Sequence, residues 1–302
     1  MSKKQLIPLI GLALVWGCYY VASQQTVKGM SVFSAGIVIR FLVMILLTVI
    51  MVIRGEFRLL FQTRKVLGRL LLIGLLGFLL DLTAFIGLSL SPAGSGTALL
   101  KCDVIFVNLI SALIYKTKFT KKDWAFTLLM LFGVFLILGV RPGNFSLGGK
   151  GGIFFILSAF FVSVNAFVIK SVQLDPESPA ADNVVAYYNN LVTMLLFTAA
   201  SLAMGTIGQI GSLAADPGLF TAGLLAGLGQ TGIYLLYYYD LRRFPVWIVK
   251  VYLLLMPMVS TLVTFALFGE RPDGMQCAGM AVVLGGALGI LLEQNRKEAQ
   301  KE

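Results

Sequence analysis

Residues 32–53 read VFSAGIVIRFLVMILLTVIMVI, a run of 22 residues in which Arg40 carries the only charge. A helix that crosses a bilayer needs about 20 predominantly apolar residues, because each residue adds about 1.5 Å to a hydrocarbon crossing of about 30 Å. Lipid offers the backbone no hydrogen bonds, and the run lacks the alternation of a barrel strand. The sequence therefore predicts a transmembrane helix here.

Runs of the same kind recur along the 302-residue chain. The chain is 58% hydrophobic and 13% charged, whereas a soluble domain is about half apolar and about a quarter charged. No water-soluble fold can hide that much apolar surface, so we expect an all-α integral membrane protein. Ten transmembrane helices are predicted, at about residues 6–23, 32–53, 69–90, 93–115, 124–140, 151–171, 183–204, 218–239, 245–268 and 274–292.

The basic residues predict the orientation. With the N-terminus in the cytoplasm, 17 Lys and Arg residues fall on the cytoplasmic side and 4 on the other, as the positive-inside rule requires. We expect a multi-pass protein of the cytoplasmic (inner) membrane with both termini cytoplasmic, a retained first helix and a cytoplasmic tail at 293–302. The net charge of +10 forms no stripe on a soluble face, so no nucleic-acid partner is expected.

The chain contains an internal repeat. When Asp81–Pro92 is placed over Tyr234–Pro245 without gaps, the two leucines and the proline at equivalent positions coincide. Two five-helix repeats are therefore predicted, at 1–145 and 150–292. Because five is odd, the second repeat must enter the membrane inverted, an arrangement common in secondary transporters.

Several short motifs carry a resemblance to a known family. They are Trp16-Gly17, the pattern Pro257…Gly269-Glu270-Arg271, and Gly285-Gly286. With these motifs the chain resembles an EamA-type member of the drug/metabolite transporter superfamily. The resemblance implies a transporter of small metabolites, in a family whose many solutes include amino acids. Together with the inverted repeat and the lysines discussed below, it predicts a secondary transporter, an exporter or exchanger of an amino-acid-like or anionic metabolite, that works by alternating access. The chain departs from the family pattern at Ile105, where the family has proline, and at Lys118, where it has glutamate.

Charged residues within predicted spans are candidates for function, because charge is costly in lipid. Asp81 and Lys101 flank the Ser91-Pro92 hairpin at nearly equal distances, so we expect them to pair, either as a structural lock or at a solute site. Arg40 lies about as deep and either joins this cluster or extends to the outer rim. Asp103 is two residues beyond Lys101 and is expected to point elsewhere.

Lys250 falls opposite Ala98 when the repeats are overlaid, one helical turn from Lys101. Lys101 and Lys250 are therefore predicted to enter one cavity from related helices and to bind an anionic or carboxylate-bearing solute. Lys250 could instead reach the cytoplasmic interface. The family resemblance also places Trp16, Tyr19 and Asn165 at the cavity. Gln230 and Tyr234, four residues apart on one helix face, are expected to face the solute as well, and ordinary helix packing is the alternative for all five.

Other chemistries find little support. The chain has no histidine, its three cysteines are far apart, and Gly148-Gly149-Lys150-Gly151 lacks the spacing of a phosphate loop. We expect no metal, no cofactor and no enzymatic activity. A coupling proton could bind Asp81 or Asp103. The rival functions are a flippase for a lipid-linked anionic headgroup and a non-transporting membrane scaffold; the oligomeric state is not indicated.

Overall fold

A computed structural model describes residues 3–91, 99–116, 119–137, 151–269 and 271–299. Within these ranges every regular element is a helix. The first half contains α1 (Lys3–Gly29), α2 (Val32–Ile53), η1 (Phe57–Gln62), α3 (Leu67–Leu90), η2 (Leu100–Cys102), α5 (Asp103–Leu113) and α6 (Lys121–Ile137). The second contains α7 (Gly152–Gln173), α8 (Asp182–Ala203), η4 (Ile207–Gly211), α9 (Ser212–Ala215), α10 (Pro217–Arg243), α11 (Val246–Tyr252), η5 (Leu253–Leu255), α12 (Met256–Phe268) and α13 (Gly274–Ala299).

Seven helical segments in the described ranges are long and apolar enough to cross a membrane. They are α1 from Leu6 onward, α2, α3, α7, α8, α10 and the continuous run Val246–Leu267. The described parts of α5 and α6 are shorter, as is the apolar part of α13, Gly274–Ile290. An all-helical protein with several membrane spans is thus confirmed, and the count of ten remains a prediction.

The outer helices separate an apolar lipid-facing side from a buried side. In α2 the exposed residues include Phe41, Ile45 and Val49, whereas Ile39 and Val43 are fully buried. This spacing of about four residues marks one face of a helix. By contrast, all seven residues of α11 are buried. The interior of the bundle therefore lies around α11 and its neighbours, and the surrounding helices present hydrocarbon to the bilayer.

The two halves share local irregularities at matching places. α2 and α8 each end shortly before a glycine in the left-handed region, Gly55 with φ 68° and Gly205 with φ 66°. Glycine is favoured there because it has no Cβ to clash. The overlay that places Asp81 on Tyr234 also places the 3-10 turn η2 on the 3-10 turn η5 when it is continued along the chain. These matching breaks are what a duplicated unit produces.

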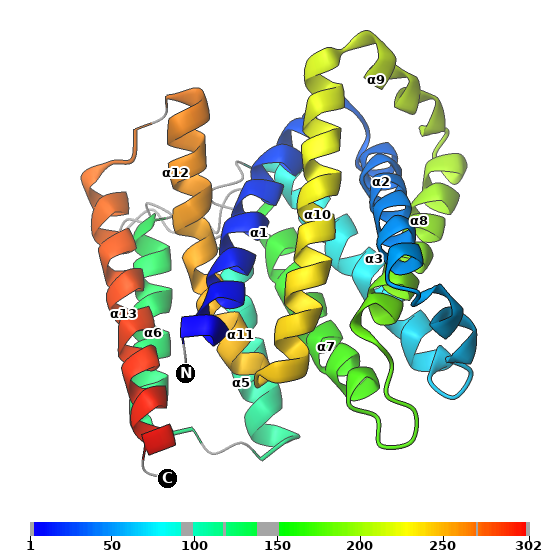
Figure 1. Cartoon of the computed structure of the whole chain (residues 1–302). Helices are drawn as coiled ribbons and strands as arrows, with labels where there is room; N and C mark the ends of the chain where they lie inside the picture. The colour runs from blue at the N-terminus through cyan, green and yellow to red at the C-terminus, as the bar shows by residue number, and fades with distance from the viewer. Residues whose placement is uncertain (1–2, 92–98, 117–118, 138–150, 270, 300–302) are drawn as a thin grey trace.

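Contacts between the halves are crossed: the end of a helix in one half meets the start of its counterpart in the other. The segment just after α2 meets the start of α8, because Glu56 accepts a hydrogen bond from Asn183. The start of α2 meets the segment just after α8, because the Ser34 hydroxyl donates to the Thr206 carbonyl at 2.7 Å. Figure 1 shows α1 and α7 running in opposite directions and both chain ends at one end of the bundle.

Candidate functional site

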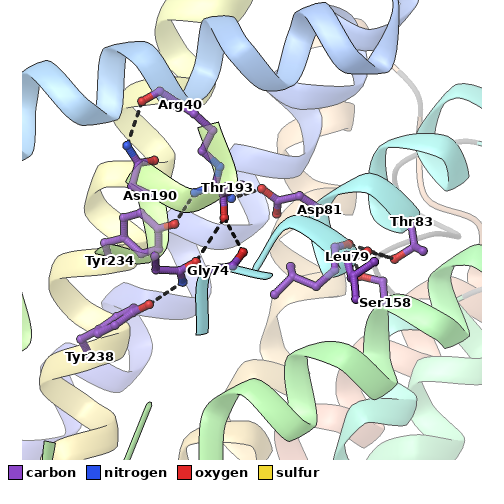
Figure 2. A network of polar contacts seen from close by, with 12 residues as sticks. Arg40, Gly74, Leu79, Asp81, Thr83, Ser158, Asn190, Thr193, Tyr234 and Tyr238 are labelled. Atoms are coloured by element: carbon purple, nitrogen blue, oxygen red, sulfur yellow. Dashed lines mark hydrogen bonds and ion pairs between the residues drawn. The ribbon is translucent and has the colours of Figure 1, made fainter. Parts of the chain in front are cut away.

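A polar cluster around Arg40 joins the two halves at the centre of the bundle (Figure 2). From α2, the Arg40 guanidinium forms an ion pair with Asp81 of α3 and donates a hydrogen bond to the Tyr234 hydroxyl of α10. Asn190 of α8 donates to the Arg40 carbonyl oxygen at 2.9 Å. Arg40 and Asp81 are 2% and 4% exposed, so their charges depend on each other rather than on water.

The expected pair between Asp81 and Lys101 is wrong, because Asp81 pairs with Arg40. Equal distance from a hairpin fixes the depth of two residues but not the helix face on which each lies. The planar guanidinium can also bind a carboxylate and a phenol together, which an ammonium does less well. Arg40 therefore joins the cluster around Asp81, and its alternative position at the outer rim is excluded by its burial.

A second charged group gathers around Trp16 of α1. The Lys250 ammonium lies 3.0 Å from the Asp103 carboxylate, and these side chains are 0% and 2% exposed. The Lys101 and Lys250 ammonium groups each lie 5.8 Å from the centre of the Trp16 ring, within reach of a cation–π interaction. The predicted convergence of the two lysines from related helices is therefore confirmed. The alternative that Lys250 reaches the cytoplasmic interface is wrong.

Asp103 also corrects an expectation. It lines the same small cavity as Lys101 and interacts with it electrostatically, so it does not point elsewhere. The reason is local: Lys101 lies in the 3-10 turn η2, which has about three residues per turn instead of 3.6. Two side chains that are two positions apart consequently point in more similar directions around the helix axis than they would in an α-helix. The cluster therefore holds two ammonium groups and one carboxylate.

Two adjoining cavities lie beside these charges. The first has a volume of about 30 Å³, and its lining includes Trp16, Tyr19, Asn165, Gln230 and Tyr234 together with Arg40 and Asp81. The second has a volume of about 10 Å³ and is lined by Lys101, Asp103 and seven further residues. The two share Trp16 and Tyr20. Each can hold no more than a few water molecules, so the bundle is closed around its polar centre.

Comparison with known proteins identifies the family. The EamA-like transporter family matches this chain twice, at residues 4–139 and 149–292. The chain belongs to the EamA-like transporter family. The "Probable amino-acid metabolite efflux pump" of Salmonella typhimurium (strain LT2) is 26% identical over 206 residues, which is 65% of this chain and 66% of that protein. The alignment thus spans just under two thirds of the relative's length.

The fold also matches a solved structure. One crystal structure aligns over 99% of this chain and 100% of its own, with a TM-score of 0.76 and 20% sequence identity. At that identity the likeness concerns the fold alone. The two family matches, and not this likeness, confirm the expected membership of the EamA-type drug/metabolite transporters.

The polar centre of this EamA-like transporter includes residues that sequence reasoning missed. In α8, Asn189 donates to the Tyr238 hydroxyl at 2.6 Å, and Thr193 donates to the Gly74 carbonyl at 3.0 Å. Tyr237 stacks edge-on against Trp16 with ring centres 5.2 Å apart. A signal was present, because Asn189 follows two tyrosines within an otherwise apolar run, and polar groups in a membrane helix need partners.

Metal ligands are not gathered anywhere in the described ranges: no three His, Cys, Asp or Glu side chains there lie close enough to hold an ion. At the polar centre of this EamA-like transporter, the buried Arg and Lys side chains instead belong to two clusters. One is neutral, with Arg40 against Asp81. The other carries one excess positive charge, with Lys101 and Lys250 against Asp103.

Proposed function

We propose that this protein is a secondary transporter that moves a small amino-acid-like or anionic metabolite across the cytoplasmic membrane, as an exporter or exchanger. Alternating access would occur between two inverted halves, at 1–145 and 150–292. Both termini, including the tail at 293–302, would lie in the cytoplasm. The amino-acid character is supported by the Salmonella relative, whose name describes a metabolite efflux pump.

The excess positive charge at Lys101 carries the proposal. Lys101 is 3% exposed, and no carboxylate among the described residues forms an ion pair with it, since the nearby Asp103 pairs with Lys250. A buried ammonium without a counter-charge is costly. An anionic group on the solute, such as a carboxylate, would supply the missing charge. The Trp16 ring beside both lysines would provide an apolar wall for the rest of the solute.

The crossed contacts support the inverted arrangement. In a parallel duplication, the end of α2 and the start of its counterpart α8 would lie on opposite sides of the membrane, whereas the contact of Glu56 with Asn183 brings them together. Because a cavity of about 30 Å³ is too small for an amino acid, the halves must separate before a solute can bind. Rocking about the polar centre would provide that separation.

Proton coupling remains part of the proposal, at Asp81 or Asp103. Each carboxylate is held by a basic partner, Arg40 or Lys250. Protonation would remove the carboxylate charge and weaken its pair, so it would favour a different arrangement of the helices that the pair joins. Transport by wild-type proteoliposomes that ignores an imposed pH gradient would remove this part of the proposal alone.

The charge argument is tested by substitution at the two lysines. We expect Lys101→Ala and Lys250→Ala to lose most counterflow of radiolabelled amino acids in proteoliposomes, whereas Lys65→Ala should transport normally. Lys65 is a matched control because its side chain is 70% exposed. Size-exclusion profiles check folding. Unchanged transport by both site variants would contradict the proposal.

A lipid-linked substrate is a second candidate, and one observation favours it. A groove of about 970 Å³ runs between α1, α10 and α12, with an apolar lining that includes Leu14, Leu225 and Leu267. These three side chains are 49%, 54% and 69% exposed, so in a bilayer they face acyl chains. Mass spectrometry of lipids retained after purification tests this candidate. Retention of one lipid class with a phosphate headgroup would favour a flippase, and its absence would favour the water-soluble solute.

A further inference from the structure

The cavity beside Arg40 contains polar groups that have no partner. Arg40 Nε and Asn165 Oδ1 are fully buried and make no hydrogen bond within the described part of the chain. Gln230, which is 5% exposed, adds a buried carboxamide beside them. All three residues line the cavity of about 30 Å³. They come from α2, α7 and α10, so both halves of the protein contribute.

Unpartnered buried groups are uncommon, because each loses its hydrogen bonds to water without replacement. Here the groups are complementary in kind: Arg40 Nε–H is a donor, Asn165 Oδ1 is an acceptor, and the Gln230 amide is both. A guest that both donates and accepts would satisfy them. Hydroxyl and carboxamide groups have this property, whereas a methyl group has neither function.

The charge of the cavity limits the guest further. Its two ionic side chains, Arg40 and Asp81, already neutralise each other. A charged guest would bring an uncompensated charge into a closed space, which is unfavourable. The neighbouring cavity with Lys101 and Asp103 carries the excess positive charge and shares Trp16 and Tyr20 with this one. A single solute could therefore place a charged end in one cavity and a neutral polar end in the other.

We propose that the cavity formed by Arg40, Asn165 and Gln230 is a specificity subsite for a neutral hydrogen-bonding group, a hydroxyl or carboxamide, at the end of the solute away from its carboxylate. The inference rests on the proposed transport function and narrows its substrate class to polar, uncharged amino-acid-like molecules. In the closed protein the subsite is large enough for water, which the polar group of the solute would replace when the halves reopen.

Isosteric solutes test the subsite. Threonine and valine differ by a hydroxyl in place of a methyl, and asparagine and leucine differ by a carboxamide in place of an isopropyl group. We expect the wild-type protein in proteoliposomes to transport the polar member of each pair about tenfold faster, the effect expected when polar groups of a site would otherwise remain unpaired. Asn165→Leu and Gln230→Leu should bring both ratios close to one.

Asn108 provides the matched control. It is 1% exposed and its Oδ1 atom also lacks a hydrogen-bond partner among the described residues, but it does not line this cavity. Asn108→Leu should therefore leave both ratios unchanged. Because Asn165 and Gln230 are on different helices, either variant is sufficient if the other does not fold.

Four results would overturn the subsite. They are equal wild-type rates within both pairs, ratios that survive Asn165→Leu and Gln230→Leu, an equal loss of selectivity in Asn108→Leu, and no transport of any of the four amino acids. The first three leave the proposed transport function intact. The fourth also removes its amino-acid form, so the two failures can be told apart.

Discussion

Removing the carboxylate of Asp103 should destabilise the protein more than removing the ammonium of Lys250. The two groups form a buried pair with N and O atoms 3.0 Å apart. Asp103→Asn leaves two buried ammonium groups, those of Lys101 and Lys250, without a counter-charge. Lys250→Met leaves Asp103 with Lys101 still near enough to interact electrostatically. The asymmetry follows from the excess positive charge of the cluster.

The expected magnitude follows from the distance. At 3.0 Å and an effective dielectric constant of about 20, two unit charges attract by about 5 kcal/mol. Breaking one partner of a buried pair typically costs about 3–5 kcal/mol. We therefore expect Asp103→Asn to cost about 4 kcal/mol and Lys250→Met about 2 kcal/mol, since part of the charge remains compensated. The double variant should cost less than the sum, because it removes both charges together.

Equilibrium unfolding in mixed SDS micelles, followed by the fluorescence of the three tryptophans, gives the free energy of each variant. The exposed pair of Lys65 and Glu177, with side chains 70% and 75% exposed, supplies the control cycle, and its coupling should be below about 1 kcal/mol. Equal costs for Asp103→Asn and Lys250→Met, or a double variant as unstable as the sum of the singles, would refute the reasoning.

Three further predictions concern packing, pH and geometry. Gly133→Ala should destabilise the protein by about 1–3 kcal/mol, because a Cβ there would lie 2.8 Å from a backbone oxygen of α13. At Gly285 an added Cβ meets open space, so Gly285→Ala should be neutral or slightly stabilising in the same SDS titration. Hydrogen bonding to Arg69 lowers the pKa of Asp175 below its ordinary value, so this pair should stabilise the protein fully above about pH 4 and lose its effect as the pH falls through the lowered value. Unfolding midpoints between pH 7 and pH 3 should therefore change less in Asp175→Asn than in the wild type, and parallel curves would contradict this. Arg40→Lys should keep the positive charge but lose one hydrogen bond, and should lower the free energy of unfolding by about 1–3 kcal/mol. An unfolding midpoint equal to that of the wild type would show that the planar guanidinium is not needed to bind Asp81 and Tyr234 together.

The glycines of α13 illustrate a limit of predicting helix packing from sequence. Gly285 belongs to a spaced small-residue motif that predicts close helix approach. In the structure nothing lies within 4 Å of its would-be Cβ, whereas Gly286 and Gly289 do meet α6. A motif identifies a helix with small residues, but the rotation of that helix decides which of them faces a neighbour.

The sequence by itself determined the membrane setting, the helical class, the duplication and the family. These depend on local hydrophobicity over about 20 residues and on the order of motifs, and both are written along the chain. It also singled out the charged residues that the structure buries in the two clusters, because any ion in a membrane span is conspicuous. The convergence of Lys101 and Lys250 followed from the repeat overlay, whereas their meeting at Trp16 is seen only in the structure.

Only the tertiary structure decided which charges pair. Asp81 was expected to bind Lys101 but binds Arg40, and Lys250 found its carboxylate on another helix, at Asp103. Depth in the membrane can be counted along a helix, but pairing depends on the azimuth of each helix and on the distance between helix axes. Those quantities are fixed by packing across the whole bundle, so no local stretch of residues contains them.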